Sequence, residues 1–127
     1  MGTMSKPRIL VVDDDAKISS LVRIILERIG GFQVREENRS FAALETAREF
    51  RPHFMLLDVD MPGKDGGDVA AEFRADPVLS TVPIVFLTSL VASRELSQLG
   101  EDCFLAKPVD PQLLIRTVRS MLPAMAA

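Results

Sequence analysis

The sequence predicts one three-layer α/β domain, in which helices cover both faces of a doubly wound, five-stranded parallel sheet. Four short apolar runs recur along the chain, at residues 9–12, 54–57, 84–87 and 103–106, a further strand is expected at residues 32–37, and segments with helical spacing of apolar residues separate the strands. The runs are continuous and do not alternate with polar residues, which is typical of strands that are buried on both faces. At 127 residues, 47% of them hydrophobic, the chain is long enough for one such core without disulfides or a structural metal.

The first strand is expected at residues 9–12, where a β-branched apolar run stops at three consecutive acids. A helix is expected from Ala16 to Ile29, because apolar residues recur along one helical face, and Gly30-Gly31 supplies a left-handed stop. The residues expected to face inward are Ile18, Leu21, Val22, Ile25, Leu26 and Ile29.

The second strand is expected at residues 32–37 and the second helix at residues 40–50, with Ser40 as its N-cap and Pro52 just after its end. The residues of this helix expected to face inward are Phe41, Leu44 and Ala47. The charges around these two elements are interpreted as a solvated face; they belong to Arg35, Glu36, Glu37, Arg39, Arg48, Glu49 and Arg51.

The third strand is expected at residues 54–57 and ends at Asp58. The turn-forming residues 62–67 come next, followed by a helix at 68–75 that Asp76-Pro77 ends. The fourth strand is expected at residues 84–87, where it ends at Thr88. His53, at a strand entrance, is interpreted as a surface or structural residue.

A weak helix is expected at residues 93–99, and the fifth strand at residues 103–106, where Cys103 is interpreted as a small buried residue. The last helix is expected at residues 110–122, because Asp110-Pro111 is a strong signal for a helix start. The residues of its shared inner face are Leu114, Val118, Met121 and Leu122. The domain is expected to cover residues 6–123, with 1–5 as a remnant of the start codon or an expression vector and 124–127 as a frayed tail.

The composition argues against several classes of function. A formal net charge of −3 is too small for the basic footprint of a nucleic-acid binder, so no direct nucleic-acid contact is expected. One Cys and one His cannot supply the usual zinc ligands. The lone Cys103 also excludes an internal disulfide framework, which favours a reducing, cytoplasmic setting. Neither a membrane-spanning run nor a signal peptide is evident, so no membrane insertion is expected.

Polar residues follow the strands at the points where they end. The carboxyl ends of parallel strands share one edge of a sheet, and in a 2-1-3-4-5 strand order Asp13, Asp14 and Asp58 would converge there. Their mutual repulsion requires a cation or shared protons, and ligands that are all oxygen favour Mg²⁺. Thr88 and Lys107 would then be placed to receive an oxyanion beside the metal. The pattern as a whole indicates a phosphoryl site, with Asp58 as the candidate nucleophile.

Four motifs end the strands in order: ILVVDDD at 9–15, LLDVDMPGKDG at 56–66, VFLTS at 85–89 and FLAKP at 104–108. Together they resemble the response-regulator receiver domains of two-component signalling, exemplified by the chemotaxis-type single-domain regulators. The resemblance covers essentially the whole chain. It implies the flavodoxin-like fold with strand order 2-1-3-4-5.

The resemblance also implies a function and a site. Asp58 would take a phosphoryl group from a phosphohistidine of a sensor histidine kinase or phosphotransfer protein. Asp14 and Asp58 would ligate Mg²⁺ directly, Asp13 would act largely through water, and the backbone carbonyl of Asp60 would complete the protein ligands. The chain would act by docking to an unidentified downstream protein target, and it would not be an enzyme beyond its own phosphotransfer and dephosphorylation.

Further roles are implied by the resemblance. Thr88 would hydrogen-bond the phosphoryl oxygen, Lys107 would pair with it, and Phe104 would be the aromatic that turns inward on activation together with Thr88. The Lys107-Pro108 peptide would be cis. Asp60 and Leu90 would tune the lifetime of the phosphoryl group.

One spacing departs from the family pattern. Thr88 and Lys107 are 19 residues apart (107 minus 88), about three fewer than expected, which is roughly one helical turn. A shortened fourth helix is therefore predicted, and it leaves the site itself intact.

Two other functions compete with the receiver interpretation. A small phosphatase of the haloacid dehalogenase type would use Asp58 as nucleophile and Asp60 as general acid. However, a further acidic pair should follow its Lys, and Asp110 is the sole acid after Lys107. The second alternative is an interaction module that keeps the fold but does not take phosphate.

Overall fold

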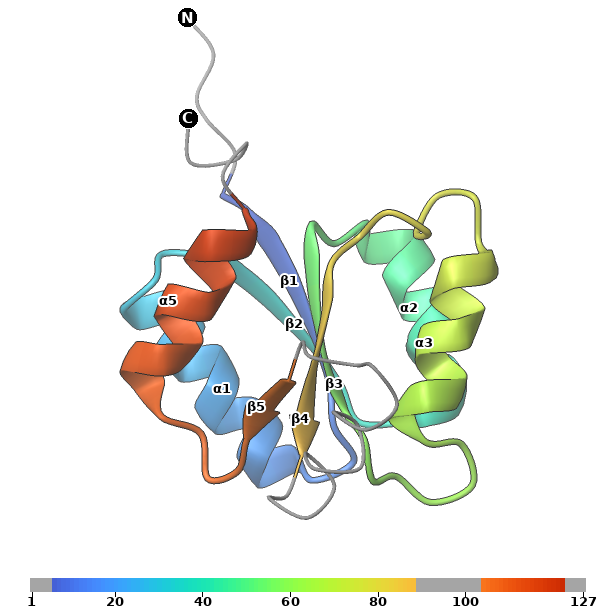
Figure 1. The fold of residues 1–127 in the computed structure, drawn as a ribbon, viewed down its shortest axis with the longest axis horizontal. Coiled ribbons are helices and arrows are strands. Elements are labelled where there is room, and N and C mark those ends of the chain that lie inside the picture. The colour runs from blue at the N-terminus through green and yellow to red at the C-terminus, as the bar shows by residue number, and fades with distance from the viewer. Residues whose placement is uncertain (1–5, 89–103, 123–127) are drawn as a thin grey trace, which may run out of the picture.

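A computed structural model describes residues 6–88 and 104–122, and it confirms the predicted fold class. All strand pairs are parallel, and the sheet has the order β2-β1-β3-β4-β5. The strands are β1 (Arg8–Val12), β2 (Gln33–Glu37), β3 (Phe54–Asp58), β4 (Ile84–Thr88) and β5 (Phe104–Ala106). The helices are α1 (Ala16–Arg28), the 3₁₀ turn η1 (Ser40–Ala42), α2 (Ala43–Phe50), α3 (Gly66–Ala75) and α5 (Pro111–Met121). In Figure 1, α1 and α5 cover one face of the sheet and α2 and α3 cover the other.

The core consists of two apolar clusters, one on each face of the sheet. Along β1, Ile9 and Val11 pack on the side of α1 and α5, while Leu10 and Val12 pack on the side of α2 and α3. All four residues are fully buried. This two-sided burial is the physical reason why the apolar runs in the sequence are continuous.

Three expectations lie outside the described residues: the fourth helix with its shortened length, the environment of Cys103, and the position of Leu90. The remnant at 1–5 and the tail at 124–127 also lie there. The domain boundaries at 6–123 stay a prediction.

The prediction that Ser40 caps the second helix is wrong. Ser40 begins η1, and α2 follows at Ala43 without a side-chain cap. This 3₁₀ turn rotates Phe41 out of the predicted inward face, so 71% of its surface is exposed. Phe41 instead lies near Gly63 and under the ammonium of Lys64, whose Nζ is 5.4 Å from the centre of its ring.

The inward face predicted for the first helix is partly wrong. Leu21 and Ile29 are 52% and 60% exposed, because α1 ends at Arg28 and its buried stripe is narrower than the apolar pattern. The third helix begins two residues earlier than predicted. Its N-cap is Asp65, which forms a reciprocal capping box with Asp68.

Glu37 is buried, which contradicts its predicted place on a solvated face. Thr46 Oγ1 donates to its Oε1 at 2.6 Å, and the backbone N and the Nε of Arg39 donate to Oε2 at 3.0 and 3.3 Å. Burial alone would raise the pKa of Glu37, but these hydrogen bonds outweigh it and lower the pKa. Hydrogen bonds from Thr46 and Arg39 therefore take the place of the water that would solvate this carboxylate.

Thr46→Val is expected to destabilise the fold by about 2 kcal/mol at pH 7, because it leaves a buried carboxylate oxygen of Glu37 without its donor. The folded pKa of Glu37 is lowered, so its contribution is present above pH 4.5, the ordinary pKa, and is lost as the pH falls through the folded value. Urea denaturation followed by circular dichroism measures the loss. Thr117→Val on α5 is the control, and an equal effect of both substitutions would contradict the prediction.

Candidate functional site

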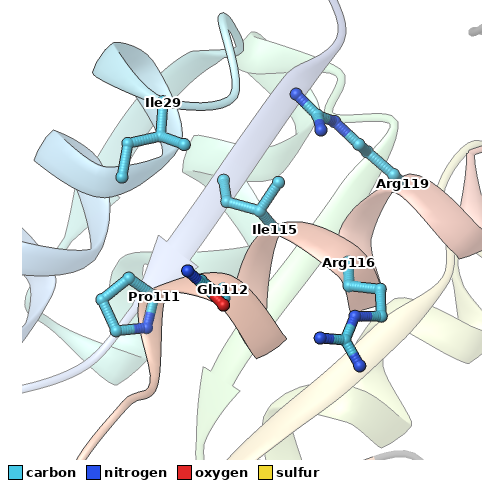
Figure 2. Close-up of a pocket in the computed structure, with 6 residues that line it drawn as sticks. All are labelled: Ile29, Pro111, Gln112, Ile115, Arg116 and Arg119. Carbon is cyan, nitrogen blue, oxygen red and sulfur yellow. The ribbon is translucent and has the colours of Figure 1, made fainter.

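A cavity of about 400 Å³ lies between the end of α1 and α5 (Figure 2). Ile29 and Ile115 lie on either side of it, and Arg116 and Arg119 add positive charge. None of its lining residues is an acid. This cavity therefore offers no carboxylate that could hold the predicted metal or act as the predicted nucleophile.

A second cavity, of about 330 Å³, lies at the carboxyl edge of the sheet. Its lining residues include every charged residue that the sequence placed at this edge, and the full set is Asp13, Asp14, Asp15, Ile18, Asp58, Asp60, Thr88 and Lys107. Because the sheet is parallel, Val12 pairs with Leu57, Asp58 with Leu87, and Thr88 with Ala106. This register brings the ends of four strands to one cavity.

Backbone hydrogen bonds continue past the strand ends and hold the site residues there. The N–H of Asp13 donates to the carbonyl of Glu37 at 3.2 Å, and the N–H of Lys107 donates to the carbonyl of Thr88 at 2.8 Å. Thr88 itself is 2% exposed. Asp13 and Lys107 are thus placed by the ladder, although each lies outside a regular strand.

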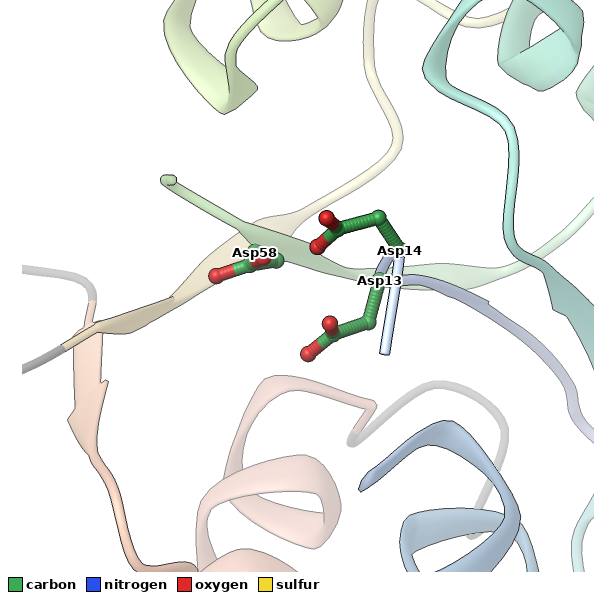
Figure 3. A group of neighbouring side chains, drawn as sticks. All are labelled: Asp13, Asp14 and Asp58. Atoms are coloured by element: carbon green, nitrogen blue, oxygen red, sulfur yellow. The ribbon is translucent and has the colours of Figure 1, made fainter. Parts of the chain in front are cut away.

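Three carboxylates converge at this edge (Figure 3). One carboxylate oxygen each of Asp13, Asp14 and Asp58 lies within 4.8 Å of the others. Asp13 and Asp58 are buried, at 0% and 2% exposure, whereas Asp14 is exposed. The predicted convergence of these three acids is therefore confirmed.

Lys107 bridges the two buried acids of the cluster. Its Nζ lies 2.9 Å from Asp58 Oδ1 and 3.1 Å from Asp13 Oδ2. The backbone N–H of Asp60 adds a hydrogen bond to Asp58 Oδ1 at 3.3 Å. With all groups ionised, three carboxylates and one ammonium leave the site with a formal charge of −2 (three minus one).

The donor set fits a divalent cation. Asp13 Oδ1 accepts a hydrogen bond from the N–H of Asp15 at 2.9 Å, but the buried Oδ2 accepts none. Its contact with Lys107 is an ion pair that lacks hydrogen-bond geometry. A buried carboxylate oxygen in a cluster with net negative charge is a position that a hard cation satisfies.

Burial shifts the pKa of the central acid. The pKa of Asp58 is raised from 3.8 to about 6, mainly by burial and secondarily by the charge of Asp13, while Lys107 opposes the shift. Burial would lower the pKa of Lys107, but its contacts with Asp58 and Asp13 outweigh it and raise the pKa. Lys107 is therefore an ammonium at neutral pH.

The remaining predicted residues are placed as follows. Asp60 is exposed at the rim of the cavity, and Phe104 is half-buried against the α2 and α3 side of the core. The Lys107-Pro108 peptide is cis, as predicted. His53 lies at the opposite edge, where its Nδ1 accepts a hydrogen bond from the N–H of Arg8 at 2.9 Å, so its predicted structural role is confirmed.

Two residues near the site were not predicted from the sequence. Asn38 donates from Nδ2 to the carbonyl of Asp13 at 2.8 Å. Gly66 lies so close to the end of β3 that a Cβ there would overlap the carbonyl oxygen of Asp58. Gly66 is the last residue of the second motif. A glycine at this place could have indicated that two backbone segments pack closely there. For Asn38, the sequence offers only its place after a strand.

Comparisons with known proteins agree with this geometry. The family model described as the response regulator receiver domain matches residues 9–119. The DNA-binding response regulator MtrA of Mycobacterium bovis is 40% identical over 125 residues, which are 96% of this chain and 53% of that protein. The DNA-binding dual master transcriptional regulator RpaA of Synechocystis is 34% identical over 119 residues, 91% of this chain and 49% of that protein. The chain thus spans about half the length of these relatives.

Solved structures show the same fold. The chemotaxis protein CheY4 of Vibrio cholerae aligns with a TM-score of 0.80 and 27% identity, covering 93% of this chain and 100% of that one. The signal receiver domain of a signal transduction histidine kinase from Syntrophus aciditrophicus aligns with a TM-score of 0.81 and 28% identity, covering 93% and 91%. The likeness therefore extends over nearly the whole chain.

Proposed function

This chain belongs to the response regulator receiver domain family, and from that premise we propose that Asp58 accepts a phosphoryl group and thereby switches partner binding. One observation carries the proposal. The buried Asp58 carboxylate lies at the floor of an acidic cavity, beside two further acids and an ammonium that contacts it at 2.9 Å. The family acts in two-component signalling.

The reaction requires little covalent chemistry of the chain. An ionised oxygen of Asp58 forms a bond to phosphorus while the bond from phosphorus to the donor's leaving atom breaks, and the leaving group takes up a proton from solvent. Lys107 is placed to neutralise charge on the incoming phosphoryl oxygens, and the Thr88 hydroxyl is proposed to donate a hydrogen bond to one of them. A pKa near 6 keeps Asp58 largely ionised at neutral pH.

We propose Mg²⁺ as the cation of the acidic cluster. Asp14 and Asp58 would hold it directly, Asp13 largely through water, and Asp60 through its backbone carbonyl. When bound, the ion supplies positive charge to the phosphoryl oxygens, a role that suits hard, oxygen-liganded cations.

Signalling is proposed to follow from the response of nearby residues. Thr88 and Phe104 form the candidate switch, because Phe104 stands in β5 beside β4, which ends at Thr88. The lifetime of the phosphoryl group is proposed to depend on Asp60 and Leu90. Phosphorylation of Asp58 would shift an equilibrium between two conformations and so change which partner-binding surface is exposed.

The proposed partners are a sensor histidine kinase or phosphotransfer protein and a downstream protein target. The relatives named as DNA-binding are about twice as long as this chain, so the expectation of no direct nucleic-acid contact concerns these 127 residues alone. A cytoplasmic location stays a prediction from the composition. Among the described helices, none has the length and apolar character needed to cross a membrane.

Incubation with acetyl phosphate tests the proposal. We expect intact mass spectrometry to show one covalent phosphoryl group when Mg²⁺ is present and none when EDTA replaces it. Continuous turnover of p-nitrophenyl phosphate would instead support the phosphatase with Asp58 and Asp60. No adduct with acetyl phosphate or with a phosphorylated kinase would support the interaction module.

A further inference from the structure

Asn38 is a polar residue between β2 and η1 whose side chain reaches two separate segments. Its Nδ2 donates to the backbone carbonyl of Asp13 at 2.8 Å and to Ser19 Oγ at 2.8 Å. A primary amide nitrogen has two N–H donors, so both are used here. Asn38 therefore ties the end of β1 to the first turns of α1.

The Ser19 end of this link is itself anchored. Ser19 is fully buried, and its hydroxyl donates to Glu36 Oε1 at 2.6 Å. Glu36 Oε2 in turn pairs with Arg23 Nε at 3.0 Å. The negative charge of Glu36 polarises the Ser19 hydroxyl and makes its oxygen a better acceptor for Asn38. This also explains why Glu36 is half-buried and not on the solvated face that the sequence predicts.

The Asp13 end of the link determines the direction of the next acid. The peptide unit between Asp13 and Asp14 is planar, so holding its carbonyl oxygen also orients the N–H and Cα of Asp14. The N–H of Asp13 is held by the carbonyl of Glu37. Without Asn38, the peptide unit before Asp13 would still be held through its N–H by Glu37. The peptide unit between Asp13 and the exposed Asp14 would lose the hydrogen bond that Asn38 donates to its carbonyl.

We propose that Asn38 is a positioning residue for the metal-binding acids: it holds the Asp13–Asp14 peptide so that Asp14 meets Asp13 and Asp58 around one cation. This inference rests on the proposed function, since it assumes that the acidic cluster binds Mg²⁺. Asn38 does not touch the ion; it reduces the freedom that Asp14 must lose when the ion binds.

Isothermal titration with Mg²⁺ at pH 8 tests this role without any phosphoryl transfer. Asn38→Ala is expected to weaken Mg²⁺ binding about tenfold, at the lower end of the range for residues that orient metal ligands. Arg23→Gln, at the far end of the same hydrogen-bonded chain, is the matched control and is expected to change the affinity by less than about twofold. Thermal unfolding in EDTA records the stability of each variant separately.

Asn38→Asp separates positioning from simple electrostatics. The substitution adds negative charge near the cluster, which by itself would tighten Mg²⁺ binding, but it replaces the donor with an oxygen that repels the carbonyl of Asp13. We expect weaker binding despite the added charge. Binding that is unchanged or tighter in this variant, or unchanged in a folded Asn38→Ala protein, would overturn the inference. A wild-type protein that does not bind Mg²⁺ would instead contradict the proposed function.

Discussion

Replacing Asp58 with Asn is expected to stabilise the metal-free protein while abolishing its ability to take a phosphoryl group. Burial raises the pKa of Asp58 from 3.8 to about 6, so the fold disfavours the carboxylate that predominates at pH 7.5. At 1.36 kcal/mol per pKa unit, this shift corresponds to about 3 kcal/mol. An amide has nearly the same shape, and its carbonyl oxygen can still accept a hydrogen bond from Lys107.

The stabilisation by Asp58→Asn is expected to increase as the pH rises. Because the folded pKa of Asp58 lies above the unfolded one, its unfavourable contribution is absent below pH 3.8, grows between pH 3.8 and about 6, and is complete above that range. Urea denaturation of both proteins in EDTA measures the difference. The prediction would be contradicted if the difference in free energy of unfolding between the two proteins did not become smaller from pH 7.5 to pH 4.5. It would also be contradicted if the variant were less stable than wild type at pH 7.5.

The functional half of the prediction uses the acetyl phosphate assay. Asp58→Asn removes the nucleophilic carboxylate, so no covalent phosphoryl group is expected at any Mg²⁺ concentration. Asp15→Asn is the matched control, because Asp15 is an exposed acid that lines the same cavity, has no proposed role in the reaction, and caps α1 with a side chain that Asn can replace. It should still be labelled. A label that persists in Asp58→Asn would show that another residue accepts the phosphoryl group.

Gly66→Ala is expected to destabilise the protein by about 3 kcal/mol. Gly66 begins α3, and its N–H donates to the carbonyl of Val59 at 3.0 Å. A Cβ there would overlap the carbonyl oxygen of Asp58 and lie 3.0 Å from Val59 Cα. These are backbone atoms next to a central strand and cannot rotate away, so α3 or the end of β3 must shift.

Thermal unfolding measures this loss, and about 3 kcal/mol corresponds to a fall in Tm of roughly 10 °C. Gly67→Ala is the matched control. A Cβ at Gly67 would meet only a side-chain oxygen of Asp65, at 3.2 Å, and Ala is a better helix residue than Gly. Equal Tm values for wild type and Gly66→Ala would show that the close packing of α3 on β3 is not required for stability.

Most of the architecture could be predicted from local patterns. Four of the five strands follow from continuous apolar runs that each end at a polar residue, and the polar residues mark the edge that carries the acids. The strand order was implied by the resemblance to receiver domains. The predictions were wrong where a local turn or local hydrogen bonds changed which side chains are buried. The η1 turn displaced Ser40 from a helix cap and exposed Phe41, and the donors Thr46 and Arg39 allowed Glu37 to be buried.

The sequence by itself determined the fold class and the membership of the acidic cluster, because burial periodicity and strand-end residues are local properties of the chain. Only the tertiary structure decided that Lys107 contacts Asp58 from 49 residues away and that Asn38 holds the Asp13 carbonyl from 25 residues away. Such contacts depend on how separate elements pack against each other. The same packing determines how deeply Asp58 is buried, and that burial raises its pKa.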